Sequence, residues 1–145
     1  MKTRLLIFLL FSGHMLSAQI ITDIGDSIFE QRLIDLNYDV PPCNGWVYTD
    51  SINNIDSLDI SSFSGQAAKI NSLAGIENFT NLQYLNCSNN KFDTLNLNKN
   101  ESLKHIICVS DSIEVLMIDS LFSLYKLQCN SNNIANLNLS GNPSL

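Results

Sequence analysis

Apolar side chains recur along the second half of the chain at a constant interval of 21 residues. Without any gap, the chain reads LQYLNCSNNKFDTLNLNKNES from Leu82, LKHIICVSDSIEVLMIDSLFS from Leu103 and LYKLQCNSNNIANLNLSGNPS from Leu124, and Leu145 opens a further copy. Positions 1, 4, 6, 11, 14 and 16 of the unit are apolar in every copy. This fixed period predicts a solenoid, because one coil buries its apolar side only by stacking on its neighbours.

The repeat unit fits L-x-x-L-x-[L/C]-x-x-N-x-[L/I/F], with cysteine in the sixth place, and resembles the leucine-rich repeat. More narrowly, a cysteine-containing unit that ends in L-x-L resembles secreted bacterial proteins that use type IX secretion. The resemblance implies a leucine-rich-repeat solenoid of the α/β class, right-handed, with a parallel β-sheet on the concave face and a mostly irregular or short-strand convex side. Chains of that family continue through more coils and usually end in a sorting domain, so this chain is expected to be truncated at its C-terminal end.

An irregular coil is predicted before the regular ones, over residues 55–81. The strand positions of the later units are matched by Ile55, Leu58 and Ile60. A step of three between apolar residues, as on the convex side of internalin-type repeats, follows at Ile70, Leu73, Ile76 and Phe79. Residues 62–68 are interpreted as an insertion, which lengthens this coil to 27 residues. Regular coils are expected at 82–102, 103–123 and 124–144, and residue 145 starts another.

Residues 19–54 lack the period and are predicted to form an N-terminal cap. Ser27 and Glu30 have the spacing of a capping box, and apolar residues then recur on one face of a helix over about 27–37. A pair of prolines ends this pattern, and a short strand is expected over 45–49. Such a cap covers the apolar end of the first coil, and the same layout precedes the repeats in the resembling family.

Residues 1–18 have the layout of a secretory signal peptide, with a basic start, a short apolar stretch and a small-residue cleavage site. The apolar stretch is too short to cross a bilayer, which takes about 20 residues, so no transmembrane segment is expected. We expect cleavage after Ala18 and a secreted or cell-surface protein.

The charge of the chain argues against nucleic acid as a partner. The net charge is −6, and loss of Lys2 and Arg4 with the signal peptide leaves six basic against fourteen acidic residues, or −8. An acidic surface repels the phosphate backbone of DNA or RNA.

The candidate ligand surface consists of the outward positions 3, 5, 7 and 8 of each strand segment, since positions 1, 4 and 6 point inward. Its members are Tyr84, Asn86, Ser88, Asn89, His105, Ile107, Val109, Ser110, Lys126, Gln128, Asn130 and Ser131. Amides, hydroxyls, an aromatic ring and an imidazole suit a polar protein loop or a glycan. An equally simple interpretation is a row of solvated strand residues. The apolar pair Ile107 and Val109 either anchors a partner or reflects strand preference alone, and strand preference is the simpler reading.

Two inward series are predicted to be structural. Asn90, Asp111 and Asn132 share the ninth position, where a buried amide satisfies backbone groups at the bend. Because an ionised Asp111 cannot donate a hydrogen bond, the second regular coil should be the weak one. Cys87, Cys108 and Cys129 form a stack of small apolar thiols. Three thiols in a row cannot all pair as disulfides, and a linear stack offers no tetrahedral metal site; Cys43 is left without a predicted partner.

The sequence does not favour an enzyme. His105 is the sole histidine after signal cleavage, and it faces the opposite side of its strand from Cys108. The chain has no glycine-rich phosphate loop and no calcium-loop pattern, and no cofactor or metal is expected. The acidic residues of the cap are most simply interpreted as solvated residues around the helix, and weak calcium binding is the alternative. They are Asp23, Asp26, Asp35 and Asp39.

We therefore expect an extracellular or cell-surface binding or adhesion module that recognises a protein or glycan through its concave face. The alternative is a structural spacer or surface-layer repeat protein without a specific ligand. Triplets of aspartate, serine or threonine and an apolar residue also resemble acceptors of bacterial O-glycosylation, although chance accounts for them equally simply. The uncapped C-terminal end should promote self-association.

Overall fold

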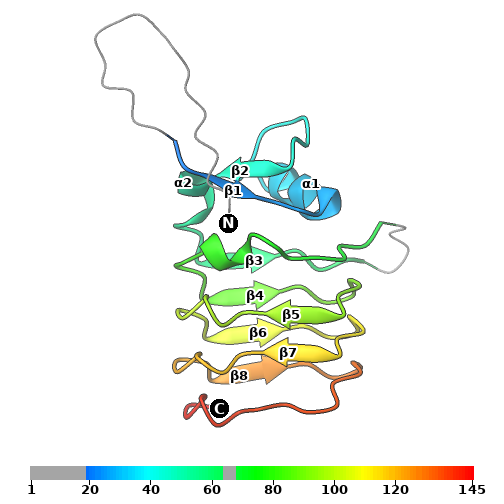
Figure 1. The fold of residues 1–145 in the computed structure, drawn as a ribbon, viewed down its shortest axis with the longest axis vertical. Coiled ribbons are helices and arrows are strands. Elements are labelled where there is room, and N and C mark those ends of the chain that lie inside the picture. The colour runs from blue at the N-terminus through cyan, green and yellow to red at the C-terminus, as the bar shows by residue number, and fades with distance from the viewer. Residues whose placement is uncertain (1–18, 64–67) are drawn as a thin grey trace, which may run out of the picture.

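The computed structural model describes residues 19–63 and 68–145, which form a stack of coils with a cap at the N-terminal end (Figure 1). Each coil contributes one short strand to a four-stranded parallel sheet in the order β3-β4-β6-β8. These strands are β3 (Ser57–Asp59), β4 (Tyr84–Asn86), β6 (His105–Ile107) and β8 (Lys126–Gln128). A second parallel pair, β5 (Thr94–Asn96) and β7 (Val115–Met117), runs in the opposite direction in Figure 1. The predicted solenoid with parallel strands and short convex strands is confirmed.

The strands pair in the register of the repeat. Leu85 lies opposite Ile106, and Ile106 lies opposite Leu127, so equivalent positions of successive coils stack on one another. The stacked columns make a continuous core that includes Leu82, Leu103, Leu124, Phe92, Ile113, Leu95, Leu116, Leu97 and Ile118. Because each column is apolar in every coil, burial of one coil is completed by the next.

The cap combines an antiparallel pair of strands, β1 (Ile21–Asp23) and β2 (Trp46–Tyr48), with α1 (Ser27–Asp35) and α2 (Thr49–Ile52). Phe29 of α1 is fully buried and stacks on Phe79 of the first coil, with ring centroids 6.2 Å apart. This contact joins the cap to the solenoid, as the sequence predicts for a cap.

The predicted capping box at Ser27 and Glu30 is wrong. The residue that caps α1 is Asp26, whose Oδ1 accepts hydrogen bonds from the backbone of Ile28 and Phe29. The side chain of Glu30 instead turns to the following loop and accepts from the backbone N–H groups of Asn44 and Gly45. Asp26 and Ser27 are adjacent, so the sequence allows either of them as the residue that caps the helix. They are distinguished only by the path of the loop at residues 44–45, which binds Glu30.

Two predictions fall wholly or partly outside the described residues: the signal peptide, residues 1–18, and the centre of the insertion, residues 64–67. The rest of the first coil carries one short 3-10 helix, η1 (Ile76–Asn78). No helix within residues 19–63 and 68–145 has the length and apolar character needed to cross a membrane.

Candidate binding face

The outward side chains of β3, β4, β6 and β8, with the turn that follows each strand, form one surface that we call the four-stranded face. The middle residue of each strand points inward: Leu58, Leu85 and Ile106 are fully buried, and Leu127 is half-buried. The residues on either side of each middle position therefore face outward, as the alternation of a strand requires.

One row of this face stacks Tyr84, His105 and Lys126 in register, with Ser57 at its start. The rings of Tyr84 and His105 meet edge to face, with centroids 5.1 Å apart and an interplanar angle of 77°. Desolvation, with a smaller contribution from the charge of Asp59, raises the pKa of Tyr84 above its ordinary value. The ring of His105 also reaches Gln128, with Nε2 3.4 Å from Oε1.

The second row stacks Asp59, Asn86, Ile107 and Gln128. Asn86 Nδ2 donates to Asp59 Oδ2 at 3.0 Å, which fixes the amide of one coil on the carboxylate of the coil before it. Ile107 is half-buried and interrupts this polar row. The sequence-based set omitted Ser57 and Asp59, although their neighbour Leu58 had been matched to a strand position and could have located them.

The turn residues of the predicted set divide into two groups. Ser88 is only 6% exposed, its Oγ accepts from Val109 N–H, and its carbonyl accepts from Ser62 N–H. Its predicted place on the ligand surface is therefore corrected: the side chain is used to hold the next coil. The other turn residues remain accessible. Val109 is half-buried, and the exposed ones are Asn89, Ser110, Asn130 and Ser131.

Three of the turn residues have a left-handed backbone, with φ of 63° at Asn89, 62° at Ser110 and 59° at Ser131. Among non-glycine residues, asparagine, aspartate and histidine are enriched in this region and serine is not, so the two serines are held there by the stacked turns. The backbone N–H of Asn89 donates to Val109 O at 2.9 Å, and that of Ser110 donates to Asn130 O at 3.2 Å.

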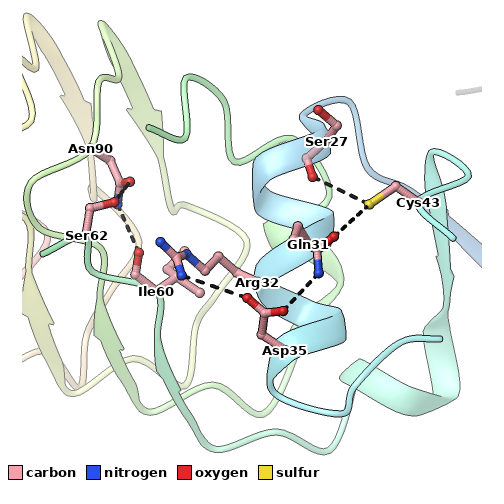
Figure 2. Close-up of polar contacts among 8 residues, drawn as sticks. All are labelled: Ser27, Gln31, Arg32, Asp35, Cys43, Ile60, Ser62 and Asn90. Carbon is pink, nitrogen blue, oxygen red and sulfur yellow. Dashed lines mark hydrogen bonds and ion pairs between the residues drawn. The ribbon is translucent and has the colours of Figure 1, made fainter. Parts of the chain in front are cut away.

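The ladder at the ninth position lies beneath these turns and supports them. Asn90 donates from Nδ2 to Ile60 O at 3.1 Å, and its Oδ1 accepts from Ser62 Oγ at 2.8 Å (Figure 2). Its Nδ2 also donates to Cys87 O at 2.7 Å. Asn132 repeats the pattern, donating to the carbonyls of Cys108 and Cys129. These amides satisfy backbone groups that the bend leaves without partners.

Asp111 is the exception in this ladder. Its Oδ1 accepts from the backbone N–H of Asn90 at 2.6 Å, while its Oδ2 is buried without a hydrogen-bond partner. In the equivalent place Asn132 carries Nδ2, a donor to two carbonyl oxygens. Burial raises the pKa of Asp111 to about 7, and the bond from Asn90 and the charge of Lys69 offset this only in part. The protonated carboxyl can donate where the ionised one cannot.

The thiols of Cys87 and Cys108 are fully buried and that of Cys129 is half-buried, and all four cysteines of the described chain are free. Burial raises the pKa of each of the three stacked thiols. They therefore stay protonated and act as small apolar side chains. Cys43 lies outside the stack, exposed beside α1, with Sγ 3.7 Å from Gln31 Oε1 (Figure 2).

The four-stranded face is open rather than hollowed. A hollow of about 280 Å³ lies at its edge, between α1 and the end of β3, and is lined by Arg32, Asp35 and Asp59 among others. Larger hollows of about 600 and 340 Å³ lie on the opposite wall, beside β5. Within the described ranges no three histidine, cysteine or acidic side chains come together in a way that could hold a metal ion. Such an open surface can bind the exposed surface of a partner without enclosing it.

No protein-family model and no curated protein matches the chain, whereas solved structures do. The functional domain of InlJ from Listeria monocytogenes, described as including a cysteine ladder, aligns with 25% identity and a TM-score of 0.74. The alignment covers 90% of this chain and 28% of that one. The internalin InlF from Listeria monocytogenes strain 4b F2365 aligns with 21% identity and a TM-score of 0.65, over 79% of this chain and 32% of the other.

This chain thus spans about a third or less of the length of the structures it matches. The description of the InlJ domain names a cysteine ladder, and the stacked thiols of this chain are a similar feature, formed by Cys87, Cys108 and Cys129. With its parallel strands in 21-residue register and its stacked cysteines, the chain has the leucine-rich-repeat fold and is similar in structure to these internalins.

Proposed function

We propose that the protein is an extracellular binding or adhesion module that holds a protein or glycan on its four-stranded face. The observation that carries this proposal is the cluster of Tyr84, His105 and Gln128 on an open sheet surface, in which His105 contacts both the ring of Tyr84 and the amide of Gln128. Aromatic side chains with polar tips offer contact area at a small loss of conformational entropy, and amides offer both donors and acceptors.

The chemistry of the described residues supports binding rather than catalysis. His105 contacts Tyr84 and Gln128 on the outer surface, whereas Cys108 is buried on the inner side with a raised pKa. A nucleophile is activated by a base within hydrogen-bonding reach or by a lowered pKa, whereas Cys108 faces away from His105 and has a raised pKa. We therefore propose a non-enzymatic role, and we place the protein outside the cell because of the signal peptide that residues 1–18 resemble.

The proposal is tested with the secreted chain on a glycan array and in a pull-down from cell-surface proteins. The variant carries Tyr84→Ala, His105→Ala and Gln128→Ala together. A matched control carries Glu114→Ala, Asn133→Ala and Asn136→Ala, three exposed residues of the opposite wall. We expect the first variant to lose a captured glycan or protein that the control retains, with unchanged melting temperatures in both.

A spacer without a ligand is the competing function, and the small exposed turn residues Asn89, Asn130 and Ser131 favour it. If the unaltered chain captures nothing in either assay, or if both triple variants capture the same molecules equally, the four-stranded face is not a recognition surface. The spacer then becomes the better account.

A further inference from the structure

A groove of about 600 Å³ runs along the wall opposite the four-stranded face, between residues 71–77 of the first coil and the strand β5. Leu73, Ile76 and Leu95 line it with apolar surface, and Thr94 and Asn96 of β5 also border it. β7 pairs with one edge of β5, and among the described residues no strand pairs with the other edge.

The edge of β5 is open because the first coil does not supply a strand there. In the regular coils, Val115 N–H donates to Asp93 O at 3.1 Å, and Leu97 N–H donates to Met117 O at 2.9 Å. Between the first coil and β5, the backbone contact among the described residues is Lys91 N–H to Ile70 O, at 2.9 Å, just before the strand.

In the segment beside β5, the first coil has one residue more than its neighbours. Ile70 and Ile76 of the first coil occupy the places that Phe92 and Leu97 hold in the next coil. The carbonyl of Ile70 accepts from Lys91 N–H, as that of Ile113 accepts from Asn133 N–H. The carbonyl of Ile76 accepts from the side-chain amide of Asn100, as that of Ile118 accepts from the amide of Asn142. The intervening segment is thus one residue longer in the first coil. Gly75 lies in this segment, with φ of 103°, a conformation that favours glycine.

The cap holds this longer segment away from β5. Asp26 Oδ2 accepts from the backbone N–H groups of Asn71 and Ser72 at 2.8 and 3.3 Å. Gly75 packs so closely against β1 that a Cβ there would lie 2.8 Å from Asp23 O. Two backbone donors of the first coil are therefore bound to the cap, and a third, Ile76 N–H, donates to Leu73 O within the first coil at 2.9 Å.

The consequence is a strand with backbone groups along the groove that have no backbone partner among residues 19–63 and 68–145. Val115 N–H and Met117 C=O face the coil before them, and Thr94 and Asn96 hold the same positions one coil earlier. Thr94 N–H and Asn96 C=O therefore face the groove. Alternate residues of a strand repeat about every 6.6 Å, a spacing that an extended polypeptide matches.

We propose that an extended peptide segment of a partner protein binds in this groove as an added strand on the free edge of β5. The unpaired donor and acceptor fit a polypeptide backbone, and the buried side chains of Leu73 and Ile76 offer an apolar floor for one of its side chains. Glu77 and Asp93 line the groove against a single cation, Lys99. This balance favours a segment that carries lysine or arginine.

The first test measures amide hydrogen exchange by NMR in the full chain with and without a probe peptide. The probe is a capped five-residue peptide, lysine-valine-threonine-valine-lysine, and its control is the same peptide N-methylated at both valines. In the free chain, Thr94 N–H should exchange as an exposed amide, while Val115 N–H is protected. The probe at millimolar concentration should slow exchange at Thr94, and the methylated peptide should not.

A second test uses variants at one position. Thr94→Pro removes the N–H that faces the groove and leaves the bonds between β5 and β7 in place, whereas Thr94→Val retains that N–H. Loss of one hydrogen bond should weaken probe binding about fivefold in the proline variant and not in the valine variant. Protection of Thr94 in the free chain, or equal binding of the methylated peptide, would overturn the proposal even if the proline variant failed to fold.

Discussion

Replacement of Asp111 by asparagine should stabilise the protein, and the gain should depend on pH. The native pKa of this carboxyl is about 7, against 3.8 for a free aspartate, so the folded chain holds the proton more tightly than the unfolded chain. The stability that the protonated group contributes is complete below about pH 4, falls as the pH rises towards 7, and is then constant.

The magnitude follows from the shift of about three pKa units. At about 1.4 kcal/mol per unit, ionisation of Asp111 removes at most about 4 kcal/mol. The unpartnered Oδ2 gives an independent lower figure, since an unsatisfied buried polar atom costs about 1 to 3 kcal/mol. Asp111→Asn supplies a permanent donor in that place, as Asn132 does in the next coil. We expect a gain of about 2 to 4 kcal/mol at pH 8 and of less than about 1 kcal/mol at pH 4.

The assay is urea unfolding of the original chain and Asp111→Asn at pH 4, 6 and 8, compared as the difference in unfolding free energy. Other ionisable groups are common to both proteins and cancel in this difference. Glu114→Gln is the control, because Glu114 is exposed and its replacement should change stability by less than about 0.5 kcal/mol at each pH. A difference that is independent of pH, or a destabilised Asp111→Asn at pH 8, would refute the reasoning.

Further predictions concern the ladder, the first coil and the C-terminal coil. Asn90→Ala removes a buried amide that joins two coils and should lower the free energy of chemical unfolding by about 2 to 4 kcal/mol. Replacement of an exposed asparagine by alanine should change it little. Gly75→Ala should lower the unfolding free energy by about 1 to 3 kcal/mol, because φ is 103° and a Cβ would lie 2.6 Å from Ile24 Cδ1; an unchanged melting temperature would contradict this. Leu139 and Leu145 are 43% and 46% exposed, so sedimentation velocity should show association that grows with concentration, and a monomer throughout would count against it.

The sequence predicted the regular coils well because a repeat tests itself. Each apolar column occurs in several copies, so a mistaken position in one unit would have conflicted with the others. The inward places of Cys87, Cys108 and Asn90, and the outward places of Tyr84 and His105, follow from that alignment. The lack of a side-chain donor at an ionised Asp111 could also be predicted, because asparagine occupies the same position in the coil on either side.

The parts that were not predicted depend on contacts between segments that no period relates. The capping role of Asp26, its bonds to Asn71 and Ser72, and the turn of Glu30 toward residues 44–45 join the cap to loops far along the chain. The burial of Ser88 likewise reflects its bond to the next coil rather than its place in a strand. A single sequence carries no signal for such pairs.

Native-state labelling of the cysteines with a bulky maleimide, located by mass spectrometry, tests the stacked core most directly. The account predicts rapid modification of the exposed Cys43, slow modification of Cys129 and none of Cys87 or Cys108, with all four modified in concentrated urea. Modification of Cys87 or Cys108 at the rate of Cys43 in the folded protein would contradict it.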